Sequence, residues 1–406
     1  MYQRIFMAAA LMAAGLGVAT AADVGAHTSI DGQVFADLSD IDQQQNGTDV
    51  APSGVGFDIK RAYLIVDHSF DDTWSANLTT EAQYIGSSSG TGYSSSTTSN
   101  SGGVTEVFIK LLYLQARLND AFVVHAGSYN SPWYGYAVNL YGYRYIERLM
   151  TERLGFANSA DWGANASGVA GGNGVFNYSL SVVDGGGYKN PTRTKDVDVE
   201  AAILVKPLAW LNFGAGAYSG HLGQVTQTTA DEASHTATRW DLIAAVLTRT
   251  LRVGVEYLDA RDFKTANPST GVLSGPGGVV VATNATAKDP TGTVVSDQAE
   301  GYSSWASYVF LPRWSVFTRY DDVRPSLDYD PNLSDHYLNF GVSYEPIPNI
   351  DLALVYKHEK VTDGSLSVSS GDGNSTYIIG GTAAAGTGIH TSGQFNEVGV
   401  YTQYTF

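Results

Sequence analysis

The sequence has no cysteine, little charge and, past its N-terminus, no long apolar run. Without cysteine no disulfide can form, and the chain suits a compartment in which free thiols would be oxidised. No later window approaches the roughly 18 apolar residues that a membrane-spanning helix needs. A mean hydropathy of -0.10, with 16% charged residues among 406, is too polar for a helical membrane protein.

Basic residues are also scarce. Lys and Arg number 23 against 40 Asp and Glu, a formal net charge of -17. Since a phosphate backbone needs a basic face, we expect no nucleic-acid partner. The eight His form no His-x-His or His-Glu-x-x-His pair, so the sequence predicts no metal site and no cofactor. The acidic balance fits an exported protein with acidic outer connections.

The N-terminus has the pattern of a secretory signal peptide. Arg4 precedes an apolar run that ends at Val18, and the small-x-small triplet Ala-Thr-Ala follows. We expect residues 1–21 to be removed, with cleavage after Ala21 or Ala22. Residues 22–406 then form a single domain without a helical anchor.

The rest of the chain divides into about sixteen runs that alternate apolar and polar side chains, which is typical of strands with two different faces. The clearest runs from Trp74 to Tyr84, whereas register is ambiguous in 57–68 and 104–118, where both faces carry apolar residues. The polar faces of the regular strands carry Glu81, Asp196, Asp198, Glu200, Arg252, Glu256, Asp351, Lys357 and Glu359.

Connection lengths separate a barrel from a soluble sandwich, which would also alternate. Short turns are predicted at 71–72, 119–120, 171–172, 206–207, 249–250, 312–313 and 346–349. Long polar connections are predicted at 39–54, 87–103, 129–158, 184–194, 220–235, 262–298, 324–335 and 362–394. Short and long connections alternate throughout, as in an all-β, transmembrane antiparallel β-barrel. Such a sheet must close, because lipid offers no hydrogen-bond partner to an open edge. The final strand ends on the aromatic Phe406.

About sixteen strands enclose an aqueous lumen rather than a packed core. The polar residues of the regular strands then form a mixed, net acidic lumen wall. Each of these residues either acts on the permeating solute or pairs with a neighbouring strand, and the sequence leaves both readings open.

The connection at 129–158, between the fifth and sixth strands, differs from the others because Tyr, Trp and Arg crowd it. Arg144 and Arg148 are four residues apart, as are Arg148 and Glu152, which is a weak helical pattern. The runs VVHAGSYNSPWYGY and YRYIERLMTERLGFANSADWGA resemble the phosphate-selective porin O and P family. The matching positions are Gly127, Tyr129, Pro132, Ile146, Glu147, Arg148, Phe156, Asp161 and Gly163.

This resemblance implies a sixteen-stranded, homotrimeric anion channel whose third extracellular loop folds into the lumen. The predicted pore constriction consists of Arg144, Arg148, Arg153, Tyr141, Tyr143, Tyr145 and Glu147. A guanidinium at the narrowest point would act on a passing ion at close range. Alternatively, Arg148 pairs with Glu147, Glu152 or a wall carboxylate and fixes the loop. The family relies on an arginine ladder and a lysine cluster, whereas this chain has nine scattered Lys, so the architecture carries over better than a phosphate preference.

The sequence therefore predicts a passive outer-membrane porin of a Gram-negative bacterium. It would be surrounded by outer-membrane lipid and would pass small inorganic anions or other small hydrophilic solutes. Two alternatives keep the barrel. One is an outer-membrane hydrolase with a Ser or acidic residue beside a His, and the other is a surface-binding barrel with a plugged lumen. Ion conduction, lipid hydrolysis and a blocked lumen respectively distinguish the three.

Overall fold

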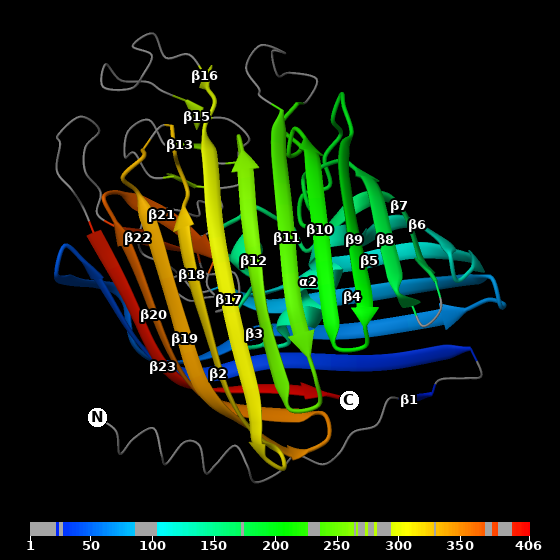
Figure 1. Ribbon diagram of the computed structural model, residues 1–406, viewed down its shortest axis with the longest axis horizontal. Coiled ribbons are helices and arrows are strands. Elements are labelled where there is room, and N and C mark those ends of the chain that lie inside the picture. The colour runs from blue at the N-terminus through cyan, green and yellow to red at the C-terminus, as the bar shows by residue number, and fades with distance from the viewer. Residues whose placement is uncertain are drawn as a thin grey trace.

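The computed structural model describes twelve segments of the chain (Figure 1). They are residues 22–23, 27–85, 104–171, 174–225, 236–263, 265–266, 273–274, 280–281, 294–328, 330–369, 376–380 and 392–406. The predicted signal peptide, the whole predicted connection at 87–103 and much of those at 220–235, 262–298 and 362–394 lie outside these segments. In the described part of the chain, no helix is long and apolar enough to span a membrane.

A closed ring of sixteen antiparallel strands confirms the predicted all-β barrel. In order they are β2 (Thr28–Gln45), β3 (Thr48–Ser69), β4 (Trp74–Ile85), β5 (Val104–Asn119), β6 (Phe122–Asn130), β7 (Ala160–Ala170), β8 (Phe176–Val183), β9 (Asp198–Leu208), β10 (Leu211–Gly220), β11 (Ala237–Leu247), β12 (Leu251–Arg261), β17 (Gln298–Leu311), β18 (Trp314–Arg324), β19 (Ser334–Ile347), β20 (Ile350–Thr362) and β23 (Ser392–Thr405). The last strand, β23, pairs with both β20 and β2, which leaves no open edge between them. The short β1 (Ala22–Asp23) pairs with β2 beside the ring.

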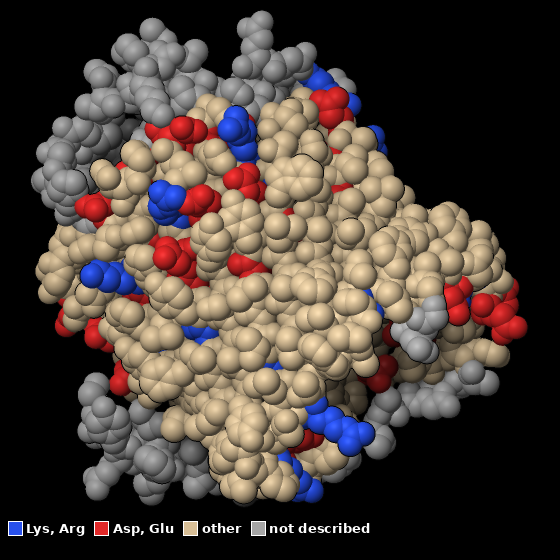
Figure 2. Space-filling model, in the orientation of Figure 1, with Lys and Arg blue, Asp and Glu red and all other residues tan. Residues whose placement is uncertain are grey.

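Alternation along the strands separates a polar interior from an apolar exterior. In β4 the side chains of Asn77, Thr79 and Glu81 are buried inside the barrel, whereas Trp74 and Leu78 point outward. Val107 is 67% exposed, which would be unfavourable in water but suits a wall that faces lipid. In Figure 2 a broad uncharged area covers the middle of the visible wall, and charged side chains lie mainly toward the strand ends.

A β-bulge in β3 explains the ambiguous register of residues 57–68. Phe35 of β2 lies opposite Arg61, and the next residue lies opposite Ile59, so Lys60 is an extra residue in β3. Lys60 and Arg61 are consequently both buried inside the barrel. The apolar positions change from odd to even numbers at this point, which a search for strict alternation cannot follow.

The second ambiguous strand, β5, has the same device. Thr79 of β4 lies opposite Leu111 and Thr80 lies opposite Ile109, so Lys110 is the extra residue. Lys110 is 4% exposed and points inward. Both bulges therefore place a lysine inside the barrel.

Most predicted short turns lie where expected, but two connections differ. Residues 39–54 form no long connection, because β2 and β3 continue to a two-residue hairpin turn at Asn46-Gly47, with φ of 49° and 77°. Asn-Gly favours this turn because both residues tolerate positive φ. The turn predicted at 206–207 lies instead between Leu208 and Leu211, because Pro207 is still part of β9.

Short strands in the outer connections form two small sheets. One contains β13 (Thr265–Ala266), β14 (Leu273–Ser274), β21 (Ser365–Ser369) and β22 (Thr376–Gly380), and the other contains β15 (Val280–Val281) and β16 (Val294–Val295). Leu366, Val368 and Ile379 of the first sheet belong to one buried apolar cluster with Met150 and Phe156. This cluster joins the outer connections to the connection between β6 and β7.

Candidate functional site

The connection between β6 and β7, residues 131–159, contains two helices, α2 (Pro132–Tyr141) and α3 (Met150–Arg153). Pro132 suits the first turn of α2, where a backbone N–H has no helical acceptor. Gly142 ends the helix in the left-handed conformation, with φ of 80°, and donates its N–H to the Val138 carbonyl. We call the whole segment the inner loop.

One face of α2 fixes the inner loop against the barrel wall. Trp133, Ala137, Leu140 and Tyr141 recur at helical spacing and pack with inward-facing residues of β9, β11 and β17. The Trp133 indole also donates a hydrogen bond to Glu256 of β12, 3.0 Å away. Glycine is required opposite it, because a Cβ at position 216 would lie 2.7 Å from the indole.

Basic side chains gather where the inner loop meets β3, β4 and β5. We define the basic cluster as Arg61, Lys110, Arg144, Arg148 and Lys189 around two carboxylates, Glu81 and Glu152. Among the residues that the structure describes, these five basic groups face two carboxylates, which leaves an excess of basic groups. This imbalance distinguishes the cluster from an ordinary buried salt-bridge network.

The carboxylates hold the basic cluster together because each is shared. Glu152 Oε1 lies 2.6 Å from Arg144, 3.3 Å from Arg61 and 3.9 Å from Arg148. Glu81 lies 3.1 Å from Arg61 and 3.4 Å from Lys110. Burial, together with the neighbouring arginines, lowers the pKa of Arg148 despite the opposing effect of Glu152. For Arg148, burial and the like charges of Arg61 and Arg144 thus outweigh the attraction of Glu152.

Tyrosines surround the basic cluster. The Tyr63 hydroxyl accepts hydrogen bonds from Arg61 and Lys110, each 2.9 Å long. The Tyr134 ring lies beneath Lys110 and Arg144, with centroid distances of 5.6 Å and 5.9 Å. These aromatic faces stabilise the cations without neutralising them.

A second connection, residues 184–197 between β8 and β9, also reaches this cluster. Tyr188 donates a hydrogen bond to Glu81 of β4 across 3.0 Å. The Lys189 ammonium lies 4.6 Å from the centre of the Phe108 ring on β5. The cluster is therefore built from three strands and two connections.

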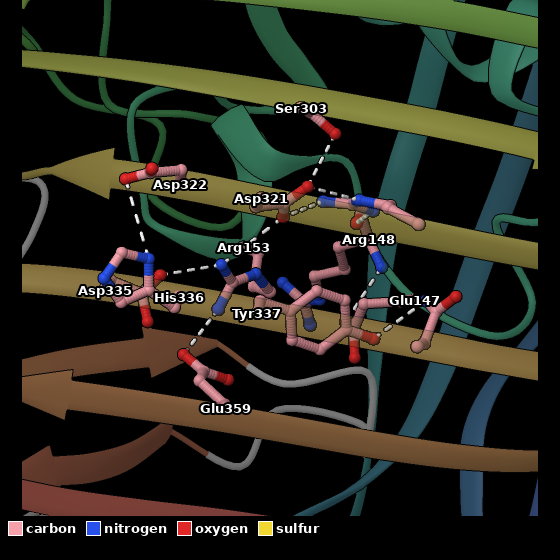
Figure 3. A network of polar contacts seen from close by, with 12 residues as sticks. Glu147, Arg148, Arg153, Ser303, Asp321, Asp322, Asp335, His336, Tyr337 and Glu359 are labelled. Carbon is pink, nitrogen blue, oxygen red and sulfur yellow. Dashed lines mark hydrogen bonds and ion pairs between the residues drawn. The ribbon is translucent and has the colours of Figure 1, made fainter.

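A different arrangement surrounds Arg153 at the end of α3 (Figure 3). Its guanidinium lies 2.8 Å from Asp335, 3.4 Å from Asp321 and 2.5 Å from Glu359, carboxylates of β19, β18 and β20. We call these four residues the acidic cage. Burial lowers the pKa of Arg153, but the three carboxylates more than reverse this and raise it well above its ordinary value. Since its side chain has no exposed surface, Arg153 is enclosed rather than offered to a solute.

Glu147 forms another attachment of the inner loop. Its carboxylate lies 3.2 Å from Lys357 of β20, which is also 3.0 Å from Glu397. Burial opposes ionisation, but Lys357, Lys60 and Arg153 together lower the pKa of Glu147 to about 2. Arg319 of β18 adds a hydrogen bond to the backbone carbonyl of Arg148.

The three predicted constriction tyrosines form an aromatic seam along this same side. Tyr141 packs edge-on against Trp305 at 5.9 Å, and Tyr143 stacks on Phe317 at 4.5 Å. Tyr145 follows at 6.2 Å from Tyr143 and is buried. The seam therefore packs the inner loop against β17 and β18.

Most predicted wall residues point inward, and each has a polar partner. Asp198 accepts hydrogen bonds from Tyr218 and from the backbone N–H groups of His221 and Leu222. Glu200 pairs with Arg239, and Asp351 accepts a hydrogen bond from Gln403. Arg252 donates hydrogen bonds to the carbonyls of Asn139 and Leu140. Glu81 belongs to the basic cluster, Glu256 binds Trp133, Lys357 pairs with Glu147, and Glu359 belongs to the acidic cage.

Asp196 requires a correction. Strand β9 begins at Asp198, so Asp196 lies in the preceding connection, where 56% of its side chain is exposed. It lies 3.8 Å from His221 rather than on the inner wall. Alternation extrapolated backwards from Asp198 placed it in the strand.

Sequence reasoning missed three of the seven members of the basic cluster, and also Tyr188, which contacts it. Arg61 and Lys110 were hidden by the bulges, and Tyr188 and Lys189 lie in a connection that carried no motif. The Lys60-Arg61 pair, two adjacent basic residues inside an apolar run, is the one signal that marks a bulge in advance. Within the described residues, no group of three or more His, Cys, Asp or Glu side chains could hold a metal ion.

No family model and no curated protein matches the sequence. Solved structures do resemble the fold. An anion-selective porin from Comamonas acidovorans has a TM-score of 0.59 at 11% identity, with 93% of this chain and 99% of that porin covered. OmpF of Salmonella typhi, solved with daunomycin, has 0.56 at 10%, with 95% and 100% covered.

The outer membrane channel DcaP of Acinetobacter baumannii has a TM-score of 0.54 at 14% identity, with 96% of this chain and 100% of DcaP covered. Such identities establish the fold alone. The resemblance to phosphate-selective porins stays a prediction from short motifs. The chain has the sixteen-stranded barrel fold of these outer-membrane porins.

Proposed function

We propose that this protein is a passive outer-membrane channel in which the inner loop narrows the lumen and the basic cluster favours small anions. The excess of basic groups over carboxylates around Arg144 and Arg148 is the observation that carries this proposal. A net positive charge at a narrow point lowers the energy of a passing anion and raises that of a cation.

The two sides of the inner loop differ in exposure, which supports a role in anion selection for one side and in attachment for the other. Arg144 and Arg148 keep 9% and 8% of their surface exposed, whereas Arg153 keeps 1%. The aromatic seam and the acidic cage hold the loop against β17 to β20, so the path we propose runs along the side that contains β3, β4 and β5. Phosphate and other small oxyanions are the solutes that guanidinium groups bind well.

Planar-bilayer recording of the refolded protein tests the channel. Stepwise conductance is expected, and its absence would reject the proposal. In a KCl gradient the reversal potential should indicate anion preference. The variant Arg144→Gln/Arg148→Gln should reduce the ratio of anion to cation permeability by about tenfold, which corresponds to about 1.4 kcal/mol from the loss of two partly screened charges.

A matched control separates this site from the general charge of the protein. Arg193→Gln removes one exposed positive charge from the 184–197 connection, and it should leave the permeability ratio within about 20% of the original, because exposed charge is screened. Competition of phosphate with chloride current tests the phosphate preference separately.

Location and assembly belong to the same proposal. We propose cleavage of residues 1–21, insertion into the outer membrane of a Gram-negative bacterium and assembly as a homotrimer. The closed barrel with an apolar outer wall supports insertion. Cross-linking of native membranes, with trimer bands expected, tests assembly.

A further inference from the structure

Lys189 is a charged residue of the basic cluster that comes from neither a strand nor the inner loop. We propose that Lys189 is a proton-dependent selectivity determinant: protonated, it adds a positive charge to the basic cluster, and neutral, it withdraws that charge. This inference rests on the proposed channel function and adds to it a specific residue, Lys189, and a dependence on pH.

Backbone contacts hold the segment around Lys189 in place. Tyr188 donates its N–H to the Ala160 carbonyl and accepts from the Trp162 indole through its own carbonyl, both at 3.0 Å. Gly187 donates to Asp161 across 3.2 Å and has φ of 77°. A Cβ on Gly187 would lie 2.9 Å from the Asn158 side chain, so this approach requires glycine.

The contacts of Tyr188 and of Lys189 itself indicate the direction of the Lys189 side chain. The Tyr188 hydroxyl reaches Glu81 in the centre of the cluster, and the ammonium of Lys189 lies over Phe108. Lys189 therefore extends toward the cluster rather than into the solution outside the barrel. The Lys189 side chain is partly buried, so its ammonium can exchange protons with water but is not fully hydrated.

The surroundings make this charge easy to lose. The charged and titratable groups that face Lys189 are Glu81 on β4, Arg61 on β3, Lys110 on β5, Arg148 in the inner loop and Tyr188 beside it. Burial and the three cations outweigh Glu81 and lower the pKa of Lys189 to about 7. Since a lowered lysine pKa favours the neutral form, the charge is present below about pH 7 and is lost as the pH rises through this value.

The consequence for permeation has a definite sign. Anion preference should be higher at about pH 6 than at about pH 8.5, because the cluster loses one positive charge between them. Reversal potentials of the full chain in a KCl gradient at both pH values measure this. We expect the permeability ratio to fall about twofold to threefold.

Two substitutions at the same position make the test specific. Lys189→Arg should keep the high ratio at both pH values, because a guanidinium does not titrate in this range. Lys189→Gln should keep the low ratio at both. Arg193→Gln, the exposed control, should titrate like the original protein.

A second measurement does not depend on conduction. The rate at which an amine-acylating reagent modifies Lys189, followed by mass spectrometry of the refolded barrel, should rise with a midpoint near pH 7, because only the neutral amine reacts. A midpoint near that of free lysine, about 10.4, would overturn the proposal. So would an unchanged pH response in Lys189→Gln. Absence of conductance would overturn the channel and this inference together, whereas conductance without a response from Lys189 would overturn this inference alone.

Discussion

The basic cluster and the acidic cage are built from the same inner loop, yet they use arginine in opposite ways. In the cage one guanidinium is surrounded by three carboxylates and is fully enclosed. In the cluster, arginines and lysines share two carboxylates and retain some exposure. The ratio of the two charge types, rather than the residue type, separates an anchor from a group that can act on a solute.

The largest expected effect comes from removing the Arg153 guanidinium from the acidic cage. Arg153→Met removes the guanidinium that Asp335 and Glu359 share, while Asp321 keeps Arg319 as a partner. We expect the free energy of unfolding to fall by about 3–5 kcal/mol. Arg144→Met should cost about 1 kcal/mol or less, because Glu152 keeps Arg61 and Arg148. Denaturant titration of both variants in lipid vesicles measures the difference, and equal losses would remove the distinction between anchor and cluster.

The second largest effect should be the loss, in acid, of the ion pair between Glu147 and Lys357. Its pKa of about 2 in the folded protein lies below the ordinary 4.5, so the stabilisation is present above pH 4.5 and is lost as the pH falls toward 2. The expected loss is on the order of 3 kcal/mol.

The variant Glu147→Gln isolates this contribution. It should unfold with a shallower pH dependence between pH 4.5 and 2 than the original protein. Its reversal potential should stay unchanged near neutral pH, since Lys357 keeps Glu397 as a partner. An identical acid profile in both proteins would show that other carboxylates carry the effect.

The smallest effect should come from removing a carboxylate from the basic cluster. Glu152→Gln removes the carboxylate that Arg61, Arg144 and Arg148 share, so anion preference should rise about twofold to fivefold. The gain should shrink between about 0.1 M and 1 M KCl, as the Debye length falls from about 10 Å to 3 Å. Glu359→Gln, the corresponding change in the cage, should leave the ratio nearly constant, and a shift toward cations in Glu152→Gln would contradict the proposed role.

The fold was accessible from the sequence because a membrane barrel repeats one simple rule. Inward and outward residues alternate, and tight turns alternate with long connections, so β4, β12 and β20 could be assigned directly. The exceptions were local. Asn46-Gly47 specifies a two-residue hairpin turn, but the polar residues around it gave the appearance of a long connection.

The site was only partly accessible, because it depends on contacts between residues far apart in the chain. The position of Arg144 and Arg148 in the third connection follows from counting strands. Nothing local indicates that Arg153 meets carboxylates of three strands, or that Tyr188 reaches Glu81, 107 residues away. The wall was predicted to be net acidic, whereas Arg61 and Lys110 give one side of it a basic character.

The bulges at Lys60 and Lys110 also determine which kinds of mutation this chain tolerates. Replacing Lys60 changes one charge, but deleting it would restore strict alternation and exchange the two faces of β3 on one side of the site. Phe57 would then turn inward and Asp58 would face the surrounding lipid. Insertions in the outer connections would leave the strand pairing unchanged. Deletion of either lysine would instead invert half a strand.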